Sequence, residues 1–138
     1  MSIATYVAIG AYSLSALGFL AFAAAFGLRD RWEPWHSEAV GTPWEELDAR
    51  LRTVILAIMR AAASGGLALA LATAYLIYRL ATGDASAGWA LPLVTLGFAI
   101  PATVVAVRFR QRTSVERPIG PALIGVLVPL VGLVASLL

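Results

Sequence analysis

The chain of 138 residues contains no cysteine, no lysine and a single histidine. Without cysteine it can form no disulfide, carry out no thiol redox chemistry and offer no thiolate to a metal. One histidine also cannot supply the paired axial ligands of the haem-carrying four-helix membrane proteins. These absences exclude quinone-linked disulfide enzymes and thiolate metal sites, and they disfavour haem carriers of that type.

Charge is scarce as well, at 13% of the residues against 60% hydrophobic residues. The long apolar stretches contain no Asp, Glu or His. Transporters driven by protons or sodium usually keep such a group inside the bilayer, because its burial is costly and is retained for a task. Small drug-efflux proteins of four helices likewise depend on a membrane-embedded glutamate. Both classes of transporter are therefore disfavoured.

The apolar residues themselves are too many for a soluble domain of this size to bury, so we expect lipid to cover the remainder. A hydrocarbon core of about 30 Å needs about 20 helical residues. The predicted spans are residues 3–28, 59–78, 89–107 and 121–138. The sequence predicts an all-α integral membrane protein, a four-helix bundle that forms one domain over residues 1–138.

The first apolar segment could also be a secretory signal peptide. A signal peptide carries basic residues ahead of its apolar run, whereas here Arg29 and Arg31 follow it. We interpret the segment as a retained span.

Arginines define the orientation, because cytoplasmic loops collect basic residues. The two long polar connections, 29–58 and 108–120, hold four arginines each, and the short connection 79–88 holds one. These eight arginines are Arg29, Arg31, Arg50, Arg52, Arg108, Arg110, Arg112 and Arg117. Both long connections are predicted to be cytoplasmic and both termini non-cytoplasmic. Neither connection is long enough to form a nucleic-acid-binding domain.

The second span is predicted to begin as an amphipathic segment in the cytoplasmic interface. Thr42 and Glu45 have the spacing of a capping box, with Pro43 at the first helical position. Apolar residues then recur at helical spacing from Trp44 onward. Such a helix is longer than the membrane, so we expect a bend near Gly65 and Gly66 or a cytoplasmic projection.

Small residues predict where helices approach closely, since lipid tails compete with any larger apolar contact. The second span has two stripes, one of Ala62, Gly66, Ala70 and Ala74 and one of Ala57, Ala61 and Gly65. The fourth span has a weaker stripe of Gly125, Gly132 and Ser136. We expect the second span to be the centre of the bundle, and the stripes serve equally for contacts within one chain or between copies.

No catalytic, cofactor or metal site is predicted. The residues that could contact a lipid or a partner are Arg60, Arg108, Arg110, Arg112, His36 and Glu38. Arg60 could instead extend its charge back to the inner surface. His36 and Glu38 are too few for a metal site. Tryptophans 32, 35 and 44 are predicted to be anchors at the inner interface and Trp89 at the outer one.

The two cytoplasmic connections carry opposite charge. Residues 29–52 hold four arginines against six acids, net −2, and residues 108–118 hold four arginines against one acid, net +3. The hypothesis is that they dock on each other and that residual positive charge meets anionic lipid.

The segment Trp35 to Leu47, between a first span and a second that opens with an amphipathic turn, resembles that of small four-span proteins of bacterial inner membranes. The wider resemblance to DoxX-like four-helix membrane proteins is one of architecture. The resemblance implies a location in the inner membrane and this topology, and it implies no activity.

Two functions are consistent with this sequence. The first is a non-enzymatic scaffold or accessory subunit of a membrane complex, bound to membrane lipids and to a protein partner or a second copy. The second is a small carrier, or a module that binds lipid or quinone, using Arg60 and an interior lined by hydroxyls. These hydroxyls belong to Tyr6, Tyr12, Ser13, Ser15, Ser64, Thr73, Tyr75, Thr95 and Thr103.

Overall fold

The computed structural model describes residues 1–115 and 119–138. Over these residues the chain forms five α-helices and one 3₁₀ turn. They are α1 (Ile3–Gly27), α2 (Pro34–Val40), the 3₁₀ turn η1 (Trp44–Glu46), α3 (Ala49–Ala81), α4 (Ala85–Thr113) and α5 (Gly120–Ser136). Helices α1, α3 and α4 are long and apolar enough to cross a membrane, and α5 is a shorter apolar helix. The all-helical fold class is confirmed for the described part of the chain.

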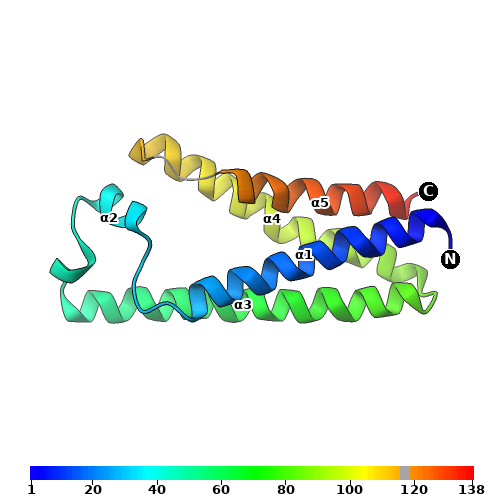
Figure 1. Cartoon of the computed structure of the whole chain (residues 1–138), viewed down its shortest axis with the longest axis horizontal. Coiled ribbons are helices and arrows are strands. Elements are labelled where there is room, and N and C mark those ends of the chain that lie inside the picture. The colour runs from blue at the N-terminus through cyan, green and yellow to red at the C-terminus, as the bar shows by residue number, and fades with distance from the viewer. Residues whose placement is uncertain (116–118) are drawn as a thin grey trace.

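The four long helices lie side by side, with both termini at one end and α2 with η1 at the other (Figure 1). Helix α1 packs on α3 and α5, α4 packs on the same two helices, and α1 meets α4 only briefly. The helices thus form a ring in which α3 has two substantial neighbours. The prediction that α3 is the centre is wrong, because α1 meets all three other long helices and α3 packs substantially on only two.

The close contact between α3 and α1 depends on Gly66. A Cβ atom placed on Gly66 would lie 2.8 Å from Phe22 Cδ1 and 3.3 Å from the Phe19 carbonyl oxygen. The buried face of α3 consists of Met59, Ala63, Gly66, Ala70 and Thr73. The predicted four-residue stripe is therefore half right, because Ala62 and Ala74 are exposed. A strict spacing of four drifts off a helix face that repeats every 3.6 residues.

Helix α3 begins later than predicted. Asp48 caps it, with Oδ1 accepting the backbone N–H of Arg50 at 2.8 Å and of Leu51 at 3.4 Å. The predicted capping box at Thr42 is wrong, since residues 44–46 form only the turn η1 and the backbone then becomes extended at Leu47. The Leu47 side chain is buried. Asp is at least as good a helix cap as Thr, and burial of Leu47 requires the break before it.

Other helix boundaries also differ from the prediction. Of the two predicted alternatives, a bend or a projection, the structure shows the projection: α3 is one continuous helix that extends past the end of α1 (Figure 1). Helix α4 continues to Thr113 through both internal prolines, so Arg108, Arg110 and Arg112 lie on its last turns rather than in a loop. The short connection predicted over residues 79–88 shrinks to a turn before Asp84, which caps α4.

The opposite end of the molecule is held by a small buried core. Tyr12 on α1 and Leu91 on α4 are fully buried, together with Ala8 and Ala135. The Tyr12 ring lies against Gly132 of α5, where a Cβ atom would come within 2.8 Å of Tyr12 Cζ. Gly132 is therefore a packing position, as its stripe predicted, whereas Gly125 of the same stripe is exposed and has nothing within 4 Å.

Candidate functional site

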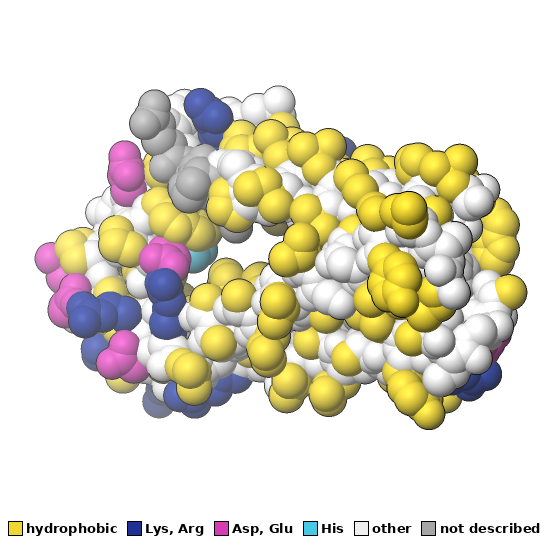
Figure 2. All heavy atoms as spheres, turned by 45° about the vertical axis from the view of Figure 1, so that its right-hand side comes forward, with side chains coloured by type: hydrophobic (Ala, Val, Ile, Leu, Met, Phe, Trp, Pro, Cys, Tyr) yellow, Lys and Arg dark blue, Asp and Glu magenta, His cyan; other side chains and the backbone are white. Residues whose placement is uncertain are grey.

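The charged side chains gather at the end of the molecule that carries α2 and η1, and apolar side chains cover most of the rest of the visible face (Figure 2). The short helix α2, which the sequence analysis missed, organises this end. Its signals were Pro34 at the first helical turn and Gly41 just after the last one. Gly41 has the left-handed backbone (φ 70°) that glycine adopts without cost.

His36 has a structural role in this helix. The backbone N–H of Glu33 donates to His36 Nδ1 at 3.2 Å, and this bond is half of a capping box. The imidazole stacks on Trp32 with ring centroids 5.8 Å apart, and it lies 3.5 Å from the Trp35 ring. His36 is thus held as a helix cap within an aromatic cluster.

The two basic connections do meet, but through rings. The Trp35 ring stands edge-on to Phe109 of α4, with centroids 5.1 Å apart. Within residues 1–115 and 119–138, the ion pairs of the first connection are local and none reaches Arg108, Arg110 or Arg112. The part of the docking hypothesis that concerns Glu116 and Arg117 lies outside the described residues. The observed contact needs no charge complementarity.

The remaining predicted contact residues are not brought together. Arg60 is exposed on α3, Glu38 is exposed on α2, and the three arginines of α4 are exposed on its last turns. Among the described residues, no group of three or more His, Asp or Glu side chains could hold a metal ion.

Several hydroxyls of the interior donate to carbonyl groups of their own helices. Ser15 donates to the Ala11 carbonyl at 3.1 Å, and Thr95 donates to the Leu91 carbonyl at 2.8 Å. Thr103 also reaches across to the Ala122 carbonyl of α5 at 3.1 Å. These three donors are already used, whereas the buried hydroxyls of Tyr12 and Thr73 have no hydrogen-bond partner among the described residues.

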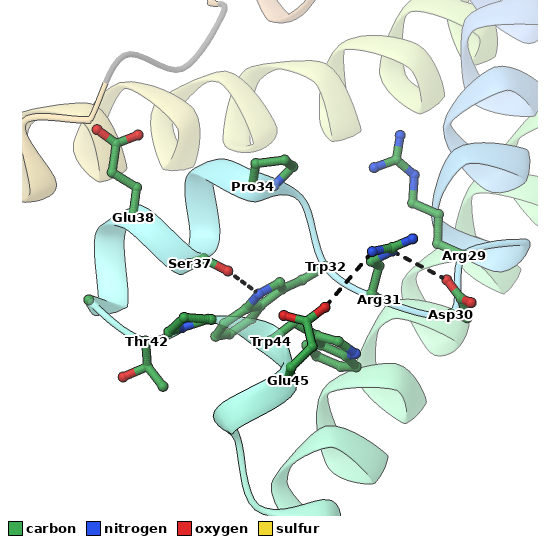
Figure 3. Close-up of a pocket in the computed structure, with 12 residues that line it drawn as sticks. Arg29, Asp30, Arg31, Trp32, Pro34, Ser37, Glu38, Thr42, Trp44 and Glu45 are labelled. Atoms are coloured by element: carbon green, nitrogen blue, oxygen red, sulfur yellow. Dashed lines mark hydrogen bonds and ion pairs between the residues drawn. The ribbon is translucent and has the colours of Figure 1, made fainter.

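A cavity of about 710 Å³ lies between the end of α1, α2 and η1. It is lined by Arg29, Asp30, Arg31, Trp32, Pro34, Ser37, Glu38, Gly41, Thr42, Pro43, Trp44 and Glu45. Figure 3 shows Trp32 and Trp44 at its centre and Arg31 extended between Asp30 and Glu45. The sequence predicts these tryptophans only as interface anchors, although aromatic and charged residues are interspersed over 29–45.

Two contacts define the geometry of this cavity. Trp32 Nε1 donates to Ser37 Oγ at 2.8 Å, and the Trp32 and Trp44 rings meet at 56° with centroids 5.5 Å apart. Arg31 lies 3.9 Å from Asp30 Oδ1 and 3.9 Å from Glu45 Oε1. The Trp32 and Trp44 rings therefore meet at an angle that the hydrogen bond to Ser37 helps to hold. Beside them, Arg31 lies between the carboxylates of Asp30 and Glu45.

The turn between α3 and α4 has a tighter ion pair. Asp84 accepts hydrogen bonds from the Ser86 hydroxyl at 2.7 Å and the Ser86 backbone N–H at 2.9 Å, and it pairs with Arg79. The hydrogen bonds from Ser86, with a further contribution from Arg79, hold the pKa of Asp84 below its usual range. This carboxylate is committed to capping α4, and it is not a candidate for chemistry.

None of the protein-family models, curated proteins or solved structures compared with this chain matches it.

Proposed function

We propose that the chain is a four-span protein of the bacterial inner membrane with both termini on the non-cytoplasmic side. Three helices have the length and composition of spans, and α5 with its 17 residues covers roughly 26 Å, close to the hydrocarbon thickness. The termini share one end of the molecule, and the segments 29–52 and 108–112, which hold seven of the ten arginines, lie near the other (Figure 1). The positive-inside rule supports this orientation.

The absence of native cysteine makes this topology directly testable. Ala85→Cys places a thiol at the exposed outer turn, and Gln111→Cys places one at the exposed end of α4. In intact spheroplasts, a membrane-impermeant maleimide should label the first variant, and it should label the second only after permeabilisation. Labelling of the Gln111→Cys variant in intact spheroplasts would reverse the orientation.

We propose further that the protein is a non-enzymatic scaffold or accessory subunit, and one surface carries this proposal. Small, exposed residues line one side of α3, here named the α3 outer face: Ala57, Ala61, Gly65, Ala68 and Ala72. A Cβ atom on Gly65 would meet nothing within 4 Å. This face lies nearly opposite the buried face of α3, by helical geometry.

Small residues matter here because helices in lipid associate through close backbone approach. On the outward sides of other helices, exposed larger residues such as Leu14 and Leu17 on α1 and Leu127 and Val131 on α5 lie among the small ones. The α3 outer face is therefore fitted to a helix of another subunit, either a partner or a second copy.

A photo-crosslinking residue at position 68, within the α3 outer face, tests this function in native membranes. We expect one discrete crosslinked product, which Gly65→Leu should abolish because the leucine holds the partner helix away. Gly18→Leu is the matched control, since Gly18 is exposed on α1 and also has nothing within 4 Å. A product that survives Gly65→Leu, or no product at all, would contradict the proposal.

The second candidate function, lipid binding, is favoured by the cavity at residues 29–45 rather than by the helix interior.

A further inference from the structure

The cavity lies where a headgroup layer would be, given the proposed membrane placement on which this inference rests. Gly27, the last residue of α1, lies beside Ala63 of α3: a Cβ atom on the glycine would be 3.2 Å from Ala63 Cβ. The apolar helix α1 therefore ends level with Ala63. The cavity lining begins two residues later, at Arg29. Headgroup and interfacial regions extend a few ångströms beyond the hydrocarbon, and Trp is enriched there.

The charges of the cavity are available to a ligand. Charge-assisted hydrogen bonds have lengths of about 2.7–2.9 Å. Arg31 is 3.9 Å from both Asp30 and Glu45, so these pairs attract each other without forming hydrogen bonds. The Arg31 and Glu45 side chains remain 66% and 71% exposed. The Arg31 guanidinium, a donor, and the Glu45 carboxylate, an acceptor, thus face the same space without a hydrogen bond between them.

The two rings add a second recognition element. His36 stacks on one face of Trp32, whose ring is held by its hydrogen bond to Ser37, and Trp44 meets this ring at an angle beside Glu45 (Figure 3). The face of an indole attracts an ammonium group, most strongly among the aromatic side chains. A carboxylate next to an indole face is a favourable site for an amine.

We propose that this cavity binds the zwitterionic phosphoethanolamine headgroup of a phospholipid. The phosphate accepts hydrogen bonds from Arg31, and the ammonium lies between Glu45 and the indole faces of Trp32 and Trp44. A purely anionic headgroup fits less well, because the lining has three carboxylates, Asp30, Glu38 and Glu45, against two guanidinium groups. The volume of about 710 Å³ is within the usual range of ligand sites.

Native mass spectrometry of the full chain in nanodiscs tests the proposal, with phosphatidylethanolamine and phosphatidylglycerol in equal amounts. We expect the ejected wild-type protein to retain phosphatidylethanolamine preferentially. Arg31→Gln and Glu45→Gln should each weaken that retention by about fivefold to tenfold, since each removes one charged contact. Glu46→Gln is the control, because Glu46 is exposed on the same turn but does not line the cavity.

Equal retention of the two lipids, or equal losses in the Glu46→Gln control, would overturn the proposal. Binding of soluble glycerophosphoethanolamine to the protein in detergent, with no preference among lipids in nanodiscs, would assign the site to a free ester and overturn the lipid assignment. Labelling of Ala85→Cys and Gln111→Cys is independent of this site. An unchanged labelling pattern therefore separates failure at the cavity from failure of the membrane topology.

Discussion

Replacing Gly66 with leucine should force α3 away from α1 and lower the melting temperature of the detergent-solubilised protein by roughly 10 °C. A single Cβ atom at this position already lies 2.8 Å from Phe22 Cδ1 and 3.3 Å from the Phe19 carbonyl oxygen. The phenyl ring could rotate away, but the backbone carbonyl cannot. Overpacking of this kind costs about 3 kcal/mol when the backbone must move.

The neighbouring glycine provides the control for this experiment. Gly65→Leu adds the same side chain one residue earlier, where nothing lies within 4 Å, so the melting temperature of the single chain should barely change. The two variants should therefore separate folding from assembly: Gly66→Leu destabilises the chain, and Gly65→Leu removes the proposed partner contact. Equal melting temperatures for Gly66→Leu and the wild type would show that α1 and α3 do not pack as described.

Replacing Gly132 with leucine is expected to have a comparable effect at the opposite end of the molecule. A Cβ atom there would lie 2.8 Å, 3.0 Å and 3.1 Å from three atoms of the Tyr12 ring. That ring is fully buried against α1, α4 and α5 residues and cannot move aside. We expect a loss of about 3 kcal/mol in unfolding free energy, read from the midpoint of denaturation in mixed micelles.

Two further variants make this second prediction specific. Gly125→Leu, on an open part of α5, should leave the midpoint unchanged. The double variant Gly132→Leu, Tyr12→Ala should lose less unfolding free energy than the two single variants lose together, because the leucine fills space that the ring vacates. Strictly additive losses would mean that Tyr12 and Gly132 do not share the contact.

The sequence predicted the structure best where a single contribution to the folding free energy dominates. Long apolar runs predicted the helices, since in lipid the backbone must satisfy its own hydrogen bonds. The boundaries were less certain, because a cap depends on what lies next to it. Thr42 had the right spacing to begin α3, but Leu47 is buried and Asp48 provides the cap. His36 had no sequence-level explanation, because its partner is the backbone of Glu33 in a helix too short to predict.

Composition and arginine placement by themselves determined that the chain is helical and apolar, and they predicted which connections face the cytoplasm. These properties follow from summed transfer free energies, which do not depend on which helix meets which. Only the tertiary structure decided that Gly66 faces α1 while Gly65 faces outward, and that Trp32, Arg31 and Glu45 surround one cavity. Such pairings depend on contacts between residues distant in sequence, and equally apolar stripes allow several of them until the helices are packed.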